Sequence, residues 1–186
     1  MPEILERVEE KLLSADEFMA LPLDHVELVR GKVVQLMPPL FEHGLWASNV
    51  DFALKSWARG TGAGYVTTEA SFRLSQNPDV VRAPDVCFMA LDQIELKDMG
   101  AYVDGAPTLA VEVKSKNETL DSLLDKAAEY LQAGSEQVWI VQPGRQRVLV
   151  LSQDESEISY RMGDSISGGE TLPGFDLSVA EIFRPL

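Results

Sequence analysis

The stretch Pro107-Thr-Leu-Ala-Val-Glu-Val-Lys114 decides the fold, because it has the pattern of a core strand and ends in two charged residues. The two-residue repeat of a strand places alternate residues on one face: Thr108, Ala110, Glu112 and Lys114. The other face is apolar. A carboxylate and an ammonium on such a strand cost free energy unless they are paired, bound to a metal or exposed to solvent. This strand therefore predicts a functional site at its end.

A second apolar stretch with a charged residue inside it lies upstream, at Arg82-Ala-Pro-Asp-Val-Cys-Phe-Met-Ala90. Asp85 interrupts the apolar run here as Glu112 does in the first stretch. We expect the two stretches to form adjacent strands, so that both carboxylates and Lys114 belong to one site.

Length and composition indicate a single globular domain over residues 1–186, with a core from about 14 to 183. The chain is 45% hydrophobic and 25% charged, as ordinary folded proteins are. No apolar run is long enough to cross a bilayer, so no membrane partner is expected. The single cysteine excludes an internal disulfide and a cysteine-based zinc site, which favours a reducing cytoplasm.

The formal net charge of −14 argues against avid, sequence-independent binding of nucleic acid. There are 30 acidic residues against 16 basic ones. An acidic chain is compatible with a site that recruits divalent cations, because a bound metal changes the local charge.

Hydrophobic periodicity divides the chain into alternating helices and strands. Expected helices are residues 14–21 with a capping box at Ser14 and Glu17, 43–59 ending at Gly60, 118–133 ending at Gly134, and 176–183. Expected strands are the hairpin 26–37 turning at Arg30-Gly31, then 65–74, 137–141, 147–151 and 158–162. This order predicts an α/β domain with a mixed, bent sheet and helices packed on it.

The two charged stretches match the PD-(D/E)xK nuclease signature through Pro84-Asp85 and Glu112-Val113-Lys114. Carboxylates on adjacent strands are able to share one Mg²⁺ or Mn²⁺, with the Val113 carbonyl as a further oxygen ligand. Lys114, on the same strand face as Glu112, would then orient or deprotonate a metal-bound water and neutralise charge on the phosphate. That chemistry is phosphodiester hydrolysis.

An ordered set of motifs extends the resemblance over almost the whole chain, from about residue 14 to 183. It comprises Glu-Leu-Val-x-Gly-x-Val-Val from residue 27, Arg-Ala-Pro-Asp-Val from 82, Pro-x-Leu-Ala-Val-Glu-Val-x-Ser from 107, Lys-x-x-x-Tyr-Leu-x-Ala-Gly from 126, Val-Trp-Ile-Val from 138 and Leu-Pro-Gly-Phe from 172. This set resembles the Uma-type family of restriction-endonuclease-like proteins. The resemblance implies the restriction-endonuclease-like fold, a Mg²⁺-dependent nuclease acting on DNA, and homodimers or higher oligomers.

Carried over residue by residue, the resemblance assigns the site to Glu27, His43, Asp85, Glu112 and a lysine, with Glu27 a further candidate metal ligand. Two lysines compete. Many members of the family have an apolar residue after Val-Glu-Val and use a lysine on the following helix, which here is Lys126. Strand-face geometry favours Lys114. Tyr130, four residues after Lys126, would orient Lys126 or the attacking water.

Each candidate residue also has an alternative interpretation in which it takes no part in catalysis. Glu112 and Lys114 would form an ordinary surface pair at the end of a strand, and Glu27 would lie at an exposed position of a hairpin. His43 would be a helix-start or core histidine, and Tyr130 a packing residue with a hydrogen-bonded hydroxyl.

Two functional classes follow from these observations. The first is a Mg²⁺-dependent endonuclease that cleaves DNA with a metal-activated water. The second is a catalytically silent, oligomeric binding or regulatory protein that retains the fold. The full set of carboxylates with lysine favours the first. The negative charge favours the second, or a nuclease that reaches DNA through a partner protein.

Overall fold

The computed structural model describes residues 11–93 and 100–185. Its α-helices are α1 (Ala15–Met19), α2 (Phe41–Thr61), α3 (Leu120–Gln132) and α4 (Val179–Ile182). Its strands are β1 (Val26–Val29), β2 (Lys32–Gln35), β3 (Gly64–Thr67), β4 (Phe72–Ser75), β5 (Val80–Arg82), β6 (Val86–Ala90), β7 (Val103–Asp104), β8 (Leu109–Val113), β9 (Gln137–Gln142), β10 (Arg147–Ser152), β11 (Glu157–Arg161), β12 (Ser165–Ser167) and β13 (Asp176–Ser178). Short 3₁₀ turns cover Leu91–Gln93 and Pro143–Arg145. No helix within these described ranges is long and apolar enough to cross a membrane.

The central sheet has the strand order β11-β10-β9-β8-β6-β3. Strand β8 lies in its middle, antiparallel to β6 and parallel to β9. The register pairs Val86 of β6 with Val111 of β8, which confirms that the two charged stretches are neighbours. The sheet is therefore mixed, as the order of helices and strands predicts.

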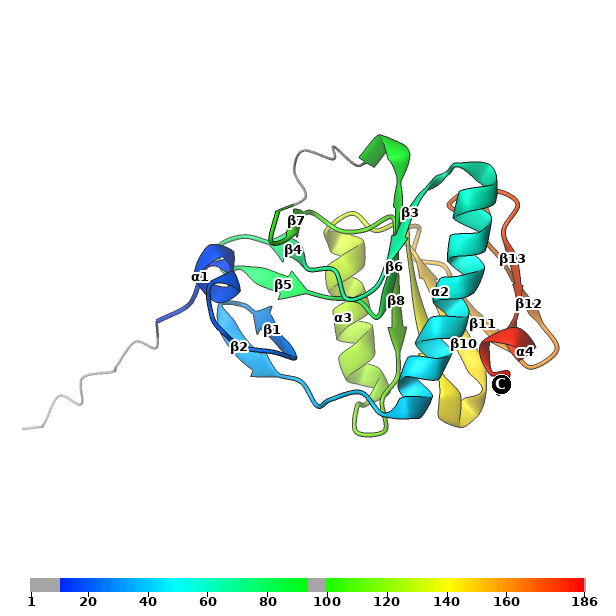
Figure 1. Cartoon of the computed structure of the whole chain (residues 1–186), viewed down its shortest axis with the longest axis horizontal. Coiled ribbons are helices and arrows are strands. Elements are labelled where there is room, and N and C mark those ends of the chain that lie inside the picture. The colour runs from blue at the N-terminus through cyan, green and yellow to red at the C-terminus, as the bar shows by residue number, and fades with distance from the viewer. Residues whose placement is uncertain (1–10, 94–99, 186) are drawn as a thin grey trace, which may run out of the picture.

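Helices cover both faces of the central sheet, with α2 on one side and α3 on the other (Figure 1). On the α2 side, Val50 and Leu54 pack with Val111 and Val113 of β8. On the α3 side, Leu123 and Ala127 pack with Ala110. The alternation expected for residues 108–114 is confirmed, because successive residues of β8 enter opposite cores.

A second sheet, of order β2-β1-β5-β4-β7, lies beside α1 and brings Glu27 and Arg82 toward α3 (Figure 1). The β1–β2 hairpin turns at Arg30-Gly31 as predicted. The capping box at the start of α1 is also confirmed, with the Ser14 hydroxyl accepting from the Glu17 N–H. Leu28 and Val81 join Phe18 in a small core of this sheet.

The strand predicted over residues 65–74 is wrong as a single element. Two short strands replace it, β3 in the central sheet and β4 in the second sheet. The chain turns at Glu69, which has a φ of 54° and donates its N–H to the Pro84 carbonyl. Alternation continues through this stretch because both halves are strands, so the pattern gave no sign of the turn.

Two helix boundaries also differ from the predictions. Helix α2 continues past Gly60 and ends with Gly62 in the left-handed region, at a φ of 70°. The predicted final helix over residues 176–183 begins instead with strand β13, which pairs with β12. Helix α3 ends as expected, with Gly134 at a φ of 114°.

Candidate active site at the ends of β6 and β8

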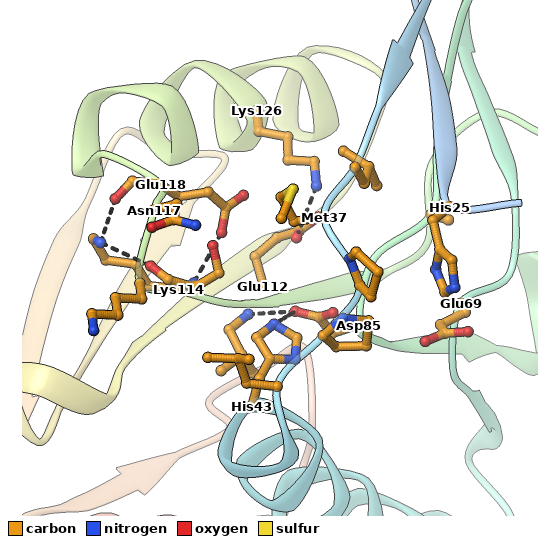
Figure 2. Close-up of a pocket in the computed structure, with 18 of the residues that line it drawn as sticks. His25, Met37, His43, Glu69, Asp85, Glu112, Lys114, Asn117, Glu118 and Lys126 are labelled. Atoms are coloured by element: carbon orange, nitrogen blue, oxygen red, sulfur yellow. Dashed lines mark hydrogen bonds and ion pairs between the residues drawn. The ribbon is translucent and has the colours of Figure 1, made fainter.

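A large cavity of about 1270 Å³ opens where the ends of β6 and β8 meet the start of α2. Its walls include five of the seven predicted catalytic residues, namely His43, Asp85, Glu112, Lys114 and Lys126, together with the predicted metal ligand Val113. Figure 2 shows Glu112 and Lys126 near its centre, with His43 and Asp85 side by side below them. The tertiary structure thus gathers residues that span more than 80 positions of the sequence.

Asp85 precedes the first residue of β6 and ties that strand to the end of β8. Its Oδ2 accepts a hydrogen bond of 2.6 Å from the Val113 N–H. The same oxygen lies 3.3 Å from Nε2 of His43, which projects from the first turn of α2. The hydrogen bond to Asp85 raises the pKa of His43 above its usual value, although burial lowers it. His43 thus has a defined partner at the cavity wall.

Glu112 is 4% exposed, and both of its oxygens are hydrogen-bonded. Lys126 Nζ donates to Oε2 at 3.0 Å, and the Tyr130 hydroxyl donates to Oε1 at 2.9 Å. Burial raises the pKa of Glu112 to about 7; Lys126 opposes that rise, while the negative charges of Asp85 and Glu27 add to it. The surface-pair interpretation of Glu112 is therefore wrong.

Lys126 forms the link between two buried carboxylates. Its Nζ lies 3.0 Å from Glu112 Oε2 and 3.0 Å from Glu27 Oε1. Burial lowers the pKa of Lys126, but the two carboxylates raise it by more, so the ammonium stays charged. The four-residue spacing on α3 places Lys126 and Tyr130 on the same side of the helix, facing β8.

Glu27 is 2% exposed, which rules out an exposed hairpin position. The Arg82 Nη1 donates to its Oε2 at 2.6 Å, while Arg82 Nε and Nη2 reach Glu129 at 2.8 and 2.7 Å. Among the residues that the structure describes, the partner of its Oε1 is the ammonium of Lys126, with which it forms an ion pair. Arg82 and Glu129 were absent from the predicted site. One feature of the sequence could have indicated Arg82 as a site residue: it is a charged residue that interrupts an apolar run just before Ala-Pro-Asp. The sequence gives no such indication for Glu129.

Lys114 leaves the strand beside Glu112, but its ammonium is bound elsewhere. Its Nζ donates to the backbone carbonyls of Ser115, at 3.1 Å, and Glu118. These bonds close the loop that joins β8 to α3, as Figure 2 shows. Of the two competing lysines, the one in contact with Glu112 is Lys126.

The donor atoms at this site are carboxylate and carbonyl oxygens, which suit Mg²⁺. No cluster of three or more His, Cys, Asp or Glu side chains is arranged for a metal within residues 11–93 and 100–185. Mg²⁺ needs only one or two carboxylates, since it keeps several waters. The N–H of Val113 points to Asp85, so its carbonyl faces the same side of β8. Burial is the main cause of the raised pKa of Glu112, and the negative charges of Asp85 and Glu27 add to it; a divalent cation bound here would offset those charges. The oxygen donors of Asp85, Glu112 and Val113 are therefore of the chemical type that Mg²⁺ binds.

Comparisons with known proteins agree with this architecture. Residues 15–180 match the Uma2 family, whose description is "Putative restriction endonuclease". Among solved structures, a crystal structure of "a putative nuclease belonging to DUF820" from Anabaena variabilis superposes with a TM-score of 0.80. It is 19% identical and covers 90% of this chain and 96% of its own, which establishes a shared fold. No protein of curated function matches the sequence.

Proposed function

Because this chain belongs to the Uma2 restriction-endonuclease family, we propose that it hydrolyses phosphodiester bonds of DNA in a Mg²⁺-dependent reaction. One observation supports this most strongly. Two carboxylates from adjacent strands, Asp85 and Glu112, line one cavity, and a charged lysine contacts the second of them at 3.0 Å. Such a set matches the carboxylates and lysine of the PD-(D/E)xK signature, with the lysine supplied by α3.

Asp85, Glu112 and the Val113 carbonyl would hold the ion, which when bound polarises the phosphate and lowers the pKa of a coordinated water. The chain's own groups orient these donors. The Val113 N–H and His43 fix Asp85, and Tyr130 and Lys126 fix the two oxygens of Glu112. Preorganised donors need little rearrangement when charge develops on the substrate.

We assign Lys126 two roles: to favour the ionised form of Glu112, whose pKa its charge lowers, and to stabilise negative charge on the phosphate. Its ammonium remains charged because two carboxylates contact it. Arg82 supports it indirectly, since it shares Glu27 with Lys126. We assign His43 the role of orienting Asp85, because the protonated Nε2 of its imidazole lies 3.3 Å from Asp85 Oδ2, which accepts from it.

The test is nicking of supercoiled plasmid by the purified protein with Mg²⁺ or Mn²⁺. Asp85→Asn and Glu112→Gln should each lower the rate about 100-fold or more, because each removes a charge that acts on the reacting groups. Asp104→Asn is the control, since that carboxylate is 64% exposed and outside the cavity. Loss of activity in the control as well would contradict the assignment.

Binding of Mn²⁺ to the wild type, followed by calorimetry, separates the two functional classes. A wild type that neither nicks DNA nor binds a divalent ion would leave the catalytically silent protein as the correct interpretation. Gel filtration with light scattering tests the homodimer or higher oligomer that the family resemblance implies.

A further inference from the structure

The outward side of α2 carries large apolar side chains that take no part in the candidate active site. Phe41 is 85% exposed and Phe52 is 74% exposed. A rotation of about 100° per residue places both in one stripe with Leu45 and Ser48, opposite the fully buried Val50. We call these four outward residues the α2 stripe. The outer side of a helix that covers a sheet is ordinarily polar, so a stripe with two exposed phenylalanines indicates a contact with another molecule.

The α2 stripe is complementary to a second copy of itself. Its members are spaced four, three and four residues apart, as along the seam of a coiled coil. When two α2 helices lie antiparallel across a two-fold axis between residues 46 and 47, Phe41 faces Phe52 of the partner subunit, and Leu45 faces the partner's Ser48. Each pair occurs twice, because a two-fold interface uses the same surface of both copies. The small Ser48 leaves room for Leu45, so the helices are able to pack closely.

The charges of α2 favour the antiparallel arrangement over a parallel one. Glu42 lies in the first turn of α2 and Arg59 in the last. Antiparallel helices bring the acidic end of each copy toward the basic end of the other, whereas parallel helices bring like charges together. Between the ends, Lys55 is paired with Asp51 at 2.8 Å. Apart from His43, α2 therefore has no net charge, and in a chain of net charge −14 it lets two copies approach with little repulsion.

The apolar area of the stripe is that of a weak dimer interface. The exposed parts of the four phenylalanines in such a pair contribute up to roughly 500–800 Å². This is half or more of the roughly 1,000 Å² that a specific interface requires. Met37 and Leu40, which are 75% and 62% exposed, immediately precede α2 and extend the apolar surface at that end of the helix. A dimer that dissociates on dilution is therefore expected.

We propose that two copies of this chain form a homodimer through the α2 stripe, with their α2 helices antiparallel. The inference goes beyond the proposed function and does not depend on it. The family resemblance implies an oligomer without naming a surface, and the α2 stripe supplies one. His43, which contacts Asp85, lies on the opposite side of α2, so the contact between copies does not use the candidate active site.

The first test measures the dimer in solution. Sedimentation equilibrium of the wild type should show a monomer and a dimer whose proportions change with concentration. Phe52→Glu should raise the dissociation constant at least about tenfold, because each dimer then has two carboxylates facing the partner's Phe41. Met162→Glu is the control and should change the constant less than about twofold, since Met162 is 48% exposed and lies in a turn outside α2. A wild type that is monomeric at every concentration, or equal effects of the two variants, would overturn the inference.

The second test measures the direction of the helices by cross-linking with a short bismaleimide. In the antiparallel pair the two Ser48 residues lie about 4–5 Å apart along the helix axis, and the two Ser56 residues about 28 Å apart. Ser48→Cys should therefore form a covalent dimer, and the matched Ser56→Cys should not. The native Cys87 is fully buried, so the wild type gives the background. Cross-linking at both positions indicates parallel helices, and that result or any pattern without a dimer at residue 48 would overturn the inference.

Discussion

Lys126 on α3 and Glu112 on β8 form a buried ion pair with a distance of 3.0 Å between Nζ and Oε2. The two residues come from different layers of the fold, and Glu27 completes the group from the second sheet. Lys114 is closer to Glu112 in sequence, yet its ammonium holds backbone carbonyls of the next loop. This contact supports the proposal that Lys126 is the catalytic lysine.

Replacing Lys126 by Met should lower DNA cleavage about 100-fold or more, whereas Lys114→Met should lower it less than about tenfold. The reason is that only Lys126 contacts Glu112. Lys126→Met should also destabilise the domain by about 3–5 kcal/mol, because it leaves two buried carboxylates without their cation. Plasmid nicking and urea unfolding measure the two effects. A larger loss of activity for Lys114→Met than for Lys126→Met would indicate that Lys114 is the catalytic lysine.

The double variant Lys126→Met with Glu27→Gln separates folding from catalysis. It removes one buried positive and one buried negative charge, so the free energy of unfolding should recover by about 1–3 kcal/mol relative to Lys126→Met. Activity should not recover. Restored cleavage in the double variant would show that Lys126 acts only by supporting the fold.

Stability should depend on pH through Glu112, whose pKa in the folded protein is about 7 against an ordinary value of 4.5. Between these values the folded state holds a proton that the unfolded state has lost. The stability that this proton provides is fully present below pH 4.5 and is lost as pH rises through about 7. The contribution is about 3 kcal/mol. Urea unfolding of the metal-free protein at pH 4.5 and pH 8 measures it.

Glu112→Gln provides the control, since it cannot titrate. Its free energy of unfolding should fall less between the two pH values than that of the wild type. Parallel pH profiles for the two proteins would show that Glu112 ionises at its ordinary pKa, and would contradict the effect of burial described above.

Arg82 should be a strong determinant of stability through its hydrogen bond to the buried carboxylate of Glu27. Arg82→Met would remove the hydrogen bond to Glu27 and should destabilise the domain by about 3 kcal/mol, because Glu27 is only 2% exposed. Arg73→Met is the matched control. It breaks an ion pair with Asp104, whose side chain is 64% exposed, and should cost less than about 1 kcal/mol. Thermal or urea unfolding compares them. Similar small losses of stability in both variants would mean that Lys126 alone compensates the buried charge of Glu27.

Local patterns predicted much of the fold correctly. The hairpin at Arg30-Gly31, the capping box at Ser14 and the end of α3 at Gly134 depend on neighbouring residues, and all three are confirmed. The single strand predicted across Glu69 is wrong, because the turn there depends on a hydrogen bond to Pro84, fifteen residues away. The prediction of a helix over residues 176–183 is also wrong in part, because its first residues form β13, which pairs with β12.

The sequence by itself showed that Asp85 and Glu112 interrupt two apolar stretches, and it predicted that these stretches would be neighbours and would form a carboxylate site. It also named Lys114 and Lys126 as alternatives, but strand periodicity specifies only the face on which a side chain begins. The tertiary structure decided where each long side chain ends. Lys126 crosses from α3 to Glu112 and Glu27, and Lys114 turns to its own loop. A flexible lysine side chain goes where partners compensate its charge, and those partners come together only when the two sheets and α3 pack.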